Sequence, residues 1–198
     1  MSSLTLPLFP LGTVLFPAGP LSLRIFEPRY LDMTRSCLKS ATPFGVVLIL
    51  EGAEVGAVSV MADTGTTARV VDFDTLPDGL LGVICLGEQR FRIARRWRQN
   101  DGLHLAEVEY LPADAPCALP AQYAHLGDLL REVLPRSGSA YAYVEEQYED
   151  AAWVANRLAE VLPLSAPQRL ELLELSDPLA RLAQAAVWSD SQPAAEQV

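Results

Sequence analysis

The sequence is short of lysine, histidine and paired cysteines, and each shortage excludes a class of protein. Its 198 residues include one lysine, Lys39, two histidines and three cysteines. No glycine-rich segment precedes Lys39, so a phosphate-binding loop of the nucleotide-hydrolase type is absent. Cys37, Cys85 and Cys117 are widely spaced and odd in number, which disfavours a disulfide framework or a cysteine zinc site and fits a reducing cytoplasm. We expect each thiol to be buried among apolar side chains.

The N-terminal stretch lacks what a secretion signal or a membrane anchor needs. No basic residue occurs before Arg24, and no run of about 20 apolar residues is present anywhere in the chain. A signal peptide combines a basic segment with an unbroken apolar helix. Here four prolines interrupt any such helix: Pro7, Pro10, Pro17 and Pro20. We therefore expect this stretch to be part of the fold, in a cytoplasmic protein without a membrane span.

Acidic residues outnumber basic ones, and the excess lies in the second half. The net charge is −10; residues 1–111 carry 10 basic and 12 acidic side chains, whereas residues 112–198 carry 5 and 13. Such a chain repels phosphate backbones, so nucleic acid is a disfavoured partner. Half of the residues are hydrophobic, which is enough for a sizeable core.

Residues 1–111 have the pattern of a β-rich lobe. Pro28 suits the first position of a helix over residues 28–40. Pro77 and Gly79 predict a tight turn and a hairpin. Alternating or β-branched apolar residues predict short strands, which indicates a small barrel or sandwich with one packed helix. These strands are expected at 44–50, 55–62, 68–76, 80–87, 89–94 and 103–111.

After a linker at residues 112–118, the apolar period changes from two to 3.6. Residues 119–188 are therefore predicted to form a small helical lobe, and residues 189–198 a frayed tail. Local signals mark three helix starts: Asp150 as an N-cap, Ser165 with Gln168 as a capping box, and Asp177 followed by Pro178.

A search for catalytic and metal-binding patterns gives no site. The sequence has no G-x-S-x-G elbow, and His104 and His125 stand alone rather than in a ligand cluster. Asp72 and Asp74 alternate along one predicted strand, on a solvated face opposite Val71 and Phe73. An enzyme acting on a small molecule would need such acids in a concave polar site. We expect no catalytic residue, no metal and no cofactor.

The segment RFRIARRWR, residues 90–98, is the one basic cluster. Arginines interleaved with Phe91 and Trp97 are typical of RNA-stacking surfaces, and this gives an alternative function. In the competing interpretation the segment is an edge strand whose Arg90 and Arg92 face water while Phe91 enters the core. The RNA-binding alternative would use Arg90, Arg92, Arg95, Arg96 and Arg98.

Three stretches in order resemble the N-terminal substrate-binding domain of the ATP-dependent protease Lon and its free-standing relatives. The first is LPLFPLGTVLFPAGPLSLRIFEPRY with the helix that follows it. The second is VGAVSVMA, then LPDGLLGVICLGEQRFRI, in which GEQRFRI is similar to a family strand motif. The third, LPLSAPQRLELLELSDPLARL, is similar to the family run L-P-L, seven residues, L-L-E, two residues, D, three residues, R-L.

The resemblance implies a six-stranded barrel like that of pseudouridine-synthase-and-archaeosine-transglycosylase (PUA) domains, joined to an α-helical lobe: an α+β fold. It also implies a non-catalytic module for protein quality control that binds polypeptide segments or a partner protein, as an adaptor. The sequence reaches none of the ATPase or protease domains of Lon, so we expect a stand-alone form. It leaves the oligomeric state open.

Candidate contact residues lie in two places, the proline-rich loop and the groove between the lobes. Prolines keep a loop stiff, which reduces the entropy lost on binding. In the competing interpretation the same side chains only close the barrel and pack the lobes. The candidates are Leu15, Phe16, Pro17, Phe26, Arg29, Tyr30, Tyr141, Tyr143 and Trp153.

Overall fold

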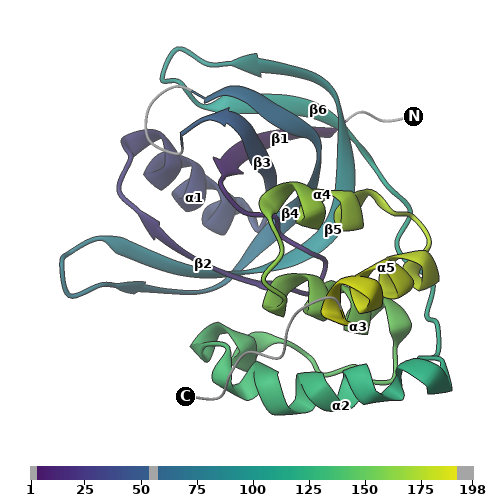
Figure 1. The fold of residues 1–198 in the computed structure, drawn as a ribbon. Helices are drawn as coiled ribbons and strands as arrows, with labels where there is room; N and C mark the ends of the chain where they lie inside the picture. Colours follow the sequence, from purple (N-terminus) through teal and green to yellow (C-terminus); the bar gives the residue numbers. More distant parts are fainter. Residues whose placement is uncertain (1–3, 54–57, 191–198) are drawn as a thin grey trace.

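A computed structural model describes residues 4–53 and 58–190 (Figure 1). Most of the predicted tail at 189–198, and the start of the predicted strand at 55–62, lie outside the described residues. The first lobe contains, in order, β1 Leu4–Leu11, β2 Pro20–Ile25, α1 Pro28–Ser40, β3 Phe44–Gly52, β4 Val58–Thr75, β5 Leu81–Arg98 and β6 His104–Tyr110.

The six strands form one sheet in the order β2-β5-β4-β3-β1-β6, and β6 also pairs with β5. Strand pairing thus returns on itself through β5, β4, β3, β1 and β6, while β2 pairs with β5 alone among the described strands. The pair of β1 and β3 is parallel and the other pairs are antiparallel. The expected mixed α+β fold with six strands is confirmed.

Four of the short strands expected from the sequence are in fact two long ones. β4 and β5 each span 18 residues, and they are joined by the predicted turn. Gly79 has a φ of +83°, and the Leu76 N–H donates to the Leu80 carbonyl at 2.8 Å, which closes the hairpin. The end of this hairpin, together with β2, extends beyond the rest of the sheet (Figure 1).

The predicted helix starts are confirmed. α1 begins at Pro28, Asp150 accepts a hydrogen bond from the Trp153 N–H, and Ser165 with Gln168 forms a capping box. The helical lobe contains η1 Ala121–Tyr123, α2 Ala124–Val133, η2 Leu134–Arg136, η3 Ser139–Tyr143, α3 Ala151–Val161, α4 Ala166–Glu174 and α5 Pro178–Asp190.

The two lobes share a core. The largest cluster of buried side chains contains helical residues such as Leu158 and Leu172, but also Phe16 and Val14 from the proline-rich loop and Leu48 from β3. Burial of this apolar surface holds the helical lobe against the sheet. The arrangement of the lobes is therefore set by a continuous core.

The cysteines are all free thiols. Cys37 and Cys85 are buried as expected, and burial raises the pKa of Cys85 to about 12. Cys117 is only half-buried, so the expectation of burial is wrong for this residue. Its segment between β6 and η1 packs on the outside of the helical core, which leaves one side of the thiol in water.

Within residues 4–53 and 58–190, every helix is too short or too polar to cross a bilayer.

Candidate functional site

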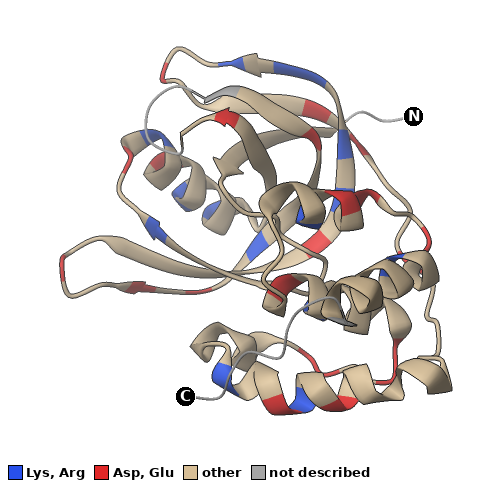
Figure 2. Cartoon of the chain, viewed as in Figure 1, with Lys and Arg blue, Asp and Glu red and all other residues tan. Residues whose placement is uncertain are grey.

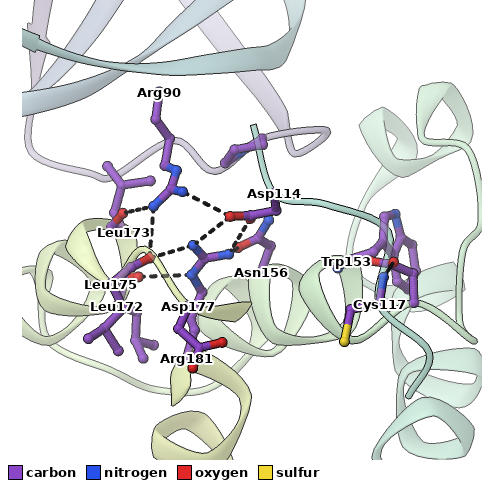
Figure 3. A network of polar contacts seen from close by, with 12 residues as sticks. Arg90, Asp114, Cys117, Trp153, Asn156, Leu172, Leu173, Leu175, Asp177 and Arg181 are labelled. Carbon is purple, nitrogen blue, oxygen red and sulfur yellow. Dashed lines mark hydrogen bonds and ion pairs between the residues drawn. The ribbon is translucent and has the colours of Figure 1, made fainter. Parts of the chain in front are cut away.

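Two buried arginines, one from each lobe, ion-pair with the same carboxylate where the lobes meet (Figure 3). Arg90 of β5 and Arg181 of α5 ion-pair with Asp114 at 2.9 and 2.6 Å. Arg90 also donates to the carbonyls of Leu173 and Leu175, both at 2.8 Å. Because buried charges are costly unless they are paired and hydrogen-bonded, this network fixes how the lobes meet.

A second polar contact ties the proline-rich loop to α3. Arg157 is fully buried; it donates to the Pro17 carbonyl at 2.9 Å and ion-pairs with Glu160 at 2.7 Å. The Tyr141 hydroxyl donates to the same carboxyl group at 2.9 Å. Burial raises the pKa of Glu160, and Arg157 opposes that rise. The loop is thereby held from the helical side.

The apolar side chains of the proline-rich loop point inward. Leu15 and Phe16 are buried, the latter completely. The Leu15 carbonyl accepts a hydrogen bond from Thr66 Oγ1 at 2.6 Å, and the Ala18 N–H donates to the Gly87 carbonyl at 2.8 Å. These two side chains therefore belong to the packed core and not to the surface.

The other predicted contact residues divide into buried and exposed groups. Tyr30 is buried and stacks on Phe9 with ring centroids 4.0 Å apart, and Trp153 is buried in the helical core. Phe26 and Tyr143 are exposed, at 52% and 41%. Half-buried positions are occupied by Pro17, Arg29 and Tyr141.

Not every member of the arginine cluster lies on the surface. Arg90 was expected to face water in both interpretations, but it is 4% exposed because the Asp114 carboxylate and two carbonyls from the helical lobe surround it. This expectation is wrong, since β-strand alternation says nothing about what covers the outer face of a sheet. The remaining members, Arg92, Arg95, Arg96 and Arg98, are exposed.

Phe73 is a surface residue that the sequence did not reveal. Asp72 and Asp74 are exposed as predicted, but Phe73, expected on the opposite and covered face, is 60% exposed. The β4–β5 register shifts between Val70 and Asp72, and β3 pairs with β4 only as far as Ala68. Among the described strands, this end of the hairpin pairs only with β2, on the β5 side, so β4 has no neighbouring strand on its other side beyond Ala68. The LPDGL turn was the only signal of this in the sequence.

Two hollows meet on β2. One, of about 640 Å³, is lined by β2 and by the end of the β4–β5 hairpin, including Phe73, Leu76 and Ile84. The other, of about 300 Å³, is lined by β2 together with side chains of β1 and α1 and with Phe26. Both include residues 22–24. This β2 surface combines exposed aromatic side chains with hollows open to water, and we take it as the candidate site.

No group of three or more metal-ligating side chains is found in the described part of the chain.

Comparison with known proteins identifies the family. The model of the ATP-dependent protease La (Lon) substrate-binding domain matches residues 5–188, nearly the whole chain. The chain belongs to this family. A Lon N-terminal domain protein from Xanthomonas campestris, known from its crystal structure, is 40% identical with a TM-score of 0.77, over 93% of this chain and 98% of that one.

Full Lon proteases are related to this Lon-type domain over part of their length. Lon protease 2 of Herpetosiphon aurantiacus is 30% identical over 91% of this chain, and Lon protease of Phenylobacterium zucineum is 29% identical over 87%. In both cases the match spans 23% of the relative. The family supports a substrate-recognition module, whereas the comparisons give the RNA-binding alternative no support.

Proposed function

We propose that this Lon-type domain is a non-catalytic module that binds polypeptide segments through the β2 surface. The family supports a role in substrate recognition. Polypeptides are recognised through exposed apolar side chains in unfolded or partly folded regions, and such side chains require an apolar counterpart on the binding protein. Of the contact residues predicted from the sequence, Phe26 is exposed and lines the smaller hollow. Tyr143 is exposed, and its hydroxyl donates to Asp72, which lines the larger hollow.

One observation carries the proposal: two phenylalanines on the β2 surface leave more than half of their area in water. Phe73 is 60% exposed beside one hollow, and Phe26 is 52% exposed beside the other. Exposing large aromatic side chains is unfavourable unless a partner covers them, and aromatic residues are enriched where proteins bind each other.

The test is binding of fluorescein-labelled β-casein, a protein without a stable fold, measured by fluorescence anisotropy. Wild type should bind it, and Phe73→Ser should weaken binding by about tenfold or more, because a buried aromatic anchor is lost. Leu129→Ser, which removes an exposed apolar side chain from α2, is the matched control and should bind as wild type. If wild type binds β-casein no better than folded ovalbumin, the proposal is wrong.

We also propose that the module acts as an adaptor, holding a segment for another protein to process. We expect the domain to bind β-casein without cleaving it, so β-casein incubated with the domain should stay at full length on a denaturing gel. Fragments that still appear when the purified domain is free of contaminating protease would contradict it. The three free thiols support a cytoplasmic location for this activity.

A further inference from the structure

Strand β2 has one edge that no other described strand occupies. All six residues of Pro20–Ile25 are paired with β5, and the described residues include no strand on the other side of β2. An edge of this kind presents a row of backbone donors and acceptors that another extended chain can use. Natural edges are blunted by charge or proline, and β2 carries Arg24 and begins at Pro20.

The ladder shows which backbone groups face outward. The Gly87 N–H donates to the Gly19 carbonyl at 2.9 Å, and the register runs from there through Ile25 without a shift. In an antiparallel pair, hydrogen-bonded positions alternate with positions whose N–H and C=O point away. Every second residue from Gly19 therefore bonds to β5, and the N–H and C=O of Ser22 and Arg24 point to the open edge. Pro20, which has no N–H, occupies an outward position.

The outward groups lie where the two hollows of the β2 surface meet. Residues 22–24 line both hollows. Leu23 and Phe26 supply apolar contacts there, and Ser22 is exposed. A chain lying along this edge would find main-chain partners at Ser22 and Arg24 and apolar hollows beside them for its side chains, which are the two components of strand addition.

The charge around this edge is acidic. Asp72, Asp74 and Asp78 line the larger hollow with a single basic residue, Arg24, which ion-pairs with Asp78. Asp72 and Asp74 form no ion pair within the described residues, and Figure 2 shows acidic positions along the hairpin. β5 lies between these carboxylates and β2, so a strand added beyond β2 would lie three strand spacings, about 15 Å, from β4. The carboxylates therefore attract cations on that strand through their field rather than by contact.

We propose that β2 binds an extended segment rich in alternating apolar and basic residues, which adds to the sheet as a further strand. Its main chain bonds to the backbone of Ser22 and Arg24, its apolar side chains enter the two hollows, and its lysines or arginines lie in the field of the hairpin carboxylates. This inference rests on the proposed function and specifies the binding mode and the chemistry of the partner.

The test uses four fluorescein-labelled, end-capped eight-residue peptides. One alternates lysine and valine, one alternates glutamate and valine, and two are the lysine peptide with every second amide N-methylated, one in each of the two possible phases. The lysine peptide should bind about tenfold tighter than the glutamate peptide at low salt, and the difference should shrink as salt is added. One methylation phase should abolish binding and the other should not, since alternate amides face opposite edges of a strand.

On the protein side, Ser22→Pro removes one outward N–H and leaves the β2–β5 ladder intact, because proline is tolerated at such edge positions. It should weaken binding of the lysine peptide about tenfold. Ser22→Ala, which keeps the N–H, should bind as wild type. Urea-unfolding midpoints equal to that of wild type establish that both variants are folded. If Ser22→Pro does not fold, the methylated peptides still show whether the peptide binds through its main chain, because they need no change to the protein.

The outcomes separate this inference from the proposed function. If β-casein binding depends on Phe73 but both methylated peptides bind as the unmethylated one, strand addition is wrong and the proposed function stands. If β-casein does not bind at all, the proposed function is wrong regardless of the peptides. Equal binding of the lysine and glutamate peptides at low salt would overturn the charge preference.

Discussion

Arg90 and Arg181 ion-pair with the same carboxylate, that of Asp114. Both arginines are at most 4% exposed, and Asp114 is 11% exposed. The network therefore places two positive charges and one negative charge in a setting that excludes most water, and the carbonyls of the α4–α5 segment compensate the excess positive charge.

Asp114→Asn should destabilise the domain strongly. It leaves two buried guanidinium groups without a counter-charge, a change that costs about 3–5 kcal/mol of unfolding free energy. Urea unfolding followed by circular dichroism measures it. Asp128→Asn breaks a solvent-exposed pair with Arg131 and should have little effect. An Asp114→Asn protein as stable as wild type would show that the carbonyls alone satisfy the arginines.

Phe16→Ala should unfold the domain more readily, whereas Phe26→Ala should not. Phe16 is completely buried in the core shared by the lobes, so its truncation leaves a cavity that costs about 3–5 kcal/mol. Phe26 is 52% exposed, and its truncation should change stability by less than about 0.5 kcal/mol. Thermal and urea unfolding of the pair check this. Similar losses for both would mean that the N-terminal loop is packed differently.

Gly87→Ala should displace the proline-rich loop. A Cβ at this position would lie 2.1 Å from the Phe16 carbonyl oxygen, which is backbone and cannot rotate away. Such overpacking costs about 1–3 kcal/mol. Gly82→Ala on the same strand is the control, because its nearest contact is the Leu76 side chain, which can move. The urea midpoint of unfolding should fall for Gly87→Ala and much less for Gly82→Ala. The reverse order would show that the Phe16 carbonyl does not lie against Gly87.

His104 should make stability depend on pH. Burial lowers the pKa of His104 below its ordinary value of 6.5, and nearby arginines, Arg98 foremost, lower it further. The unfolded chain thus takes up the proton more readily than the folded one. The stability that the folded protein gains from keeping His104 neutral is fully present above pH 6.5. It is lost as the pH falls toward the pKa of His104 in the folded protein.

His104→Gln should reduce the difference in unfolding free energy between about pH 7.5 and about pH 5.5, measured by urea denaturation. His125→Gln, which replaces the exposed histidine of α2, should leave that difference unchanged. An equal reduction in both variants would remove His104 as the cause.

Much of the fold could be predicted from the sequence because it depends on local interactions. The capping oxygens of Asp150 and Ser165 bond within their own helices, Pro28 starts α1, and Gly79 supplies the positive φ of its turn. The candidate site was found only in part. Phe26 and Tyr143 are exposed as a contact role requires, but Phe16 is buried and Phe73 was missed, since exposure depends on what packs over a residue.

The sequence by itself determined the α+β composition, the order of elements and the family. Periodicity, helix caps and turns depend on residues that are close together in the sequence. Only the tertiary structure decided that Arg90 of the GEQRFRI motif and Arg181 of the last motif share Asp114, and that β2 has an open edge within the described residues. Both depend on segments far apart in the chain. Their meeting is fixed by the shared core, where burial of apolar surface outweighs local preference.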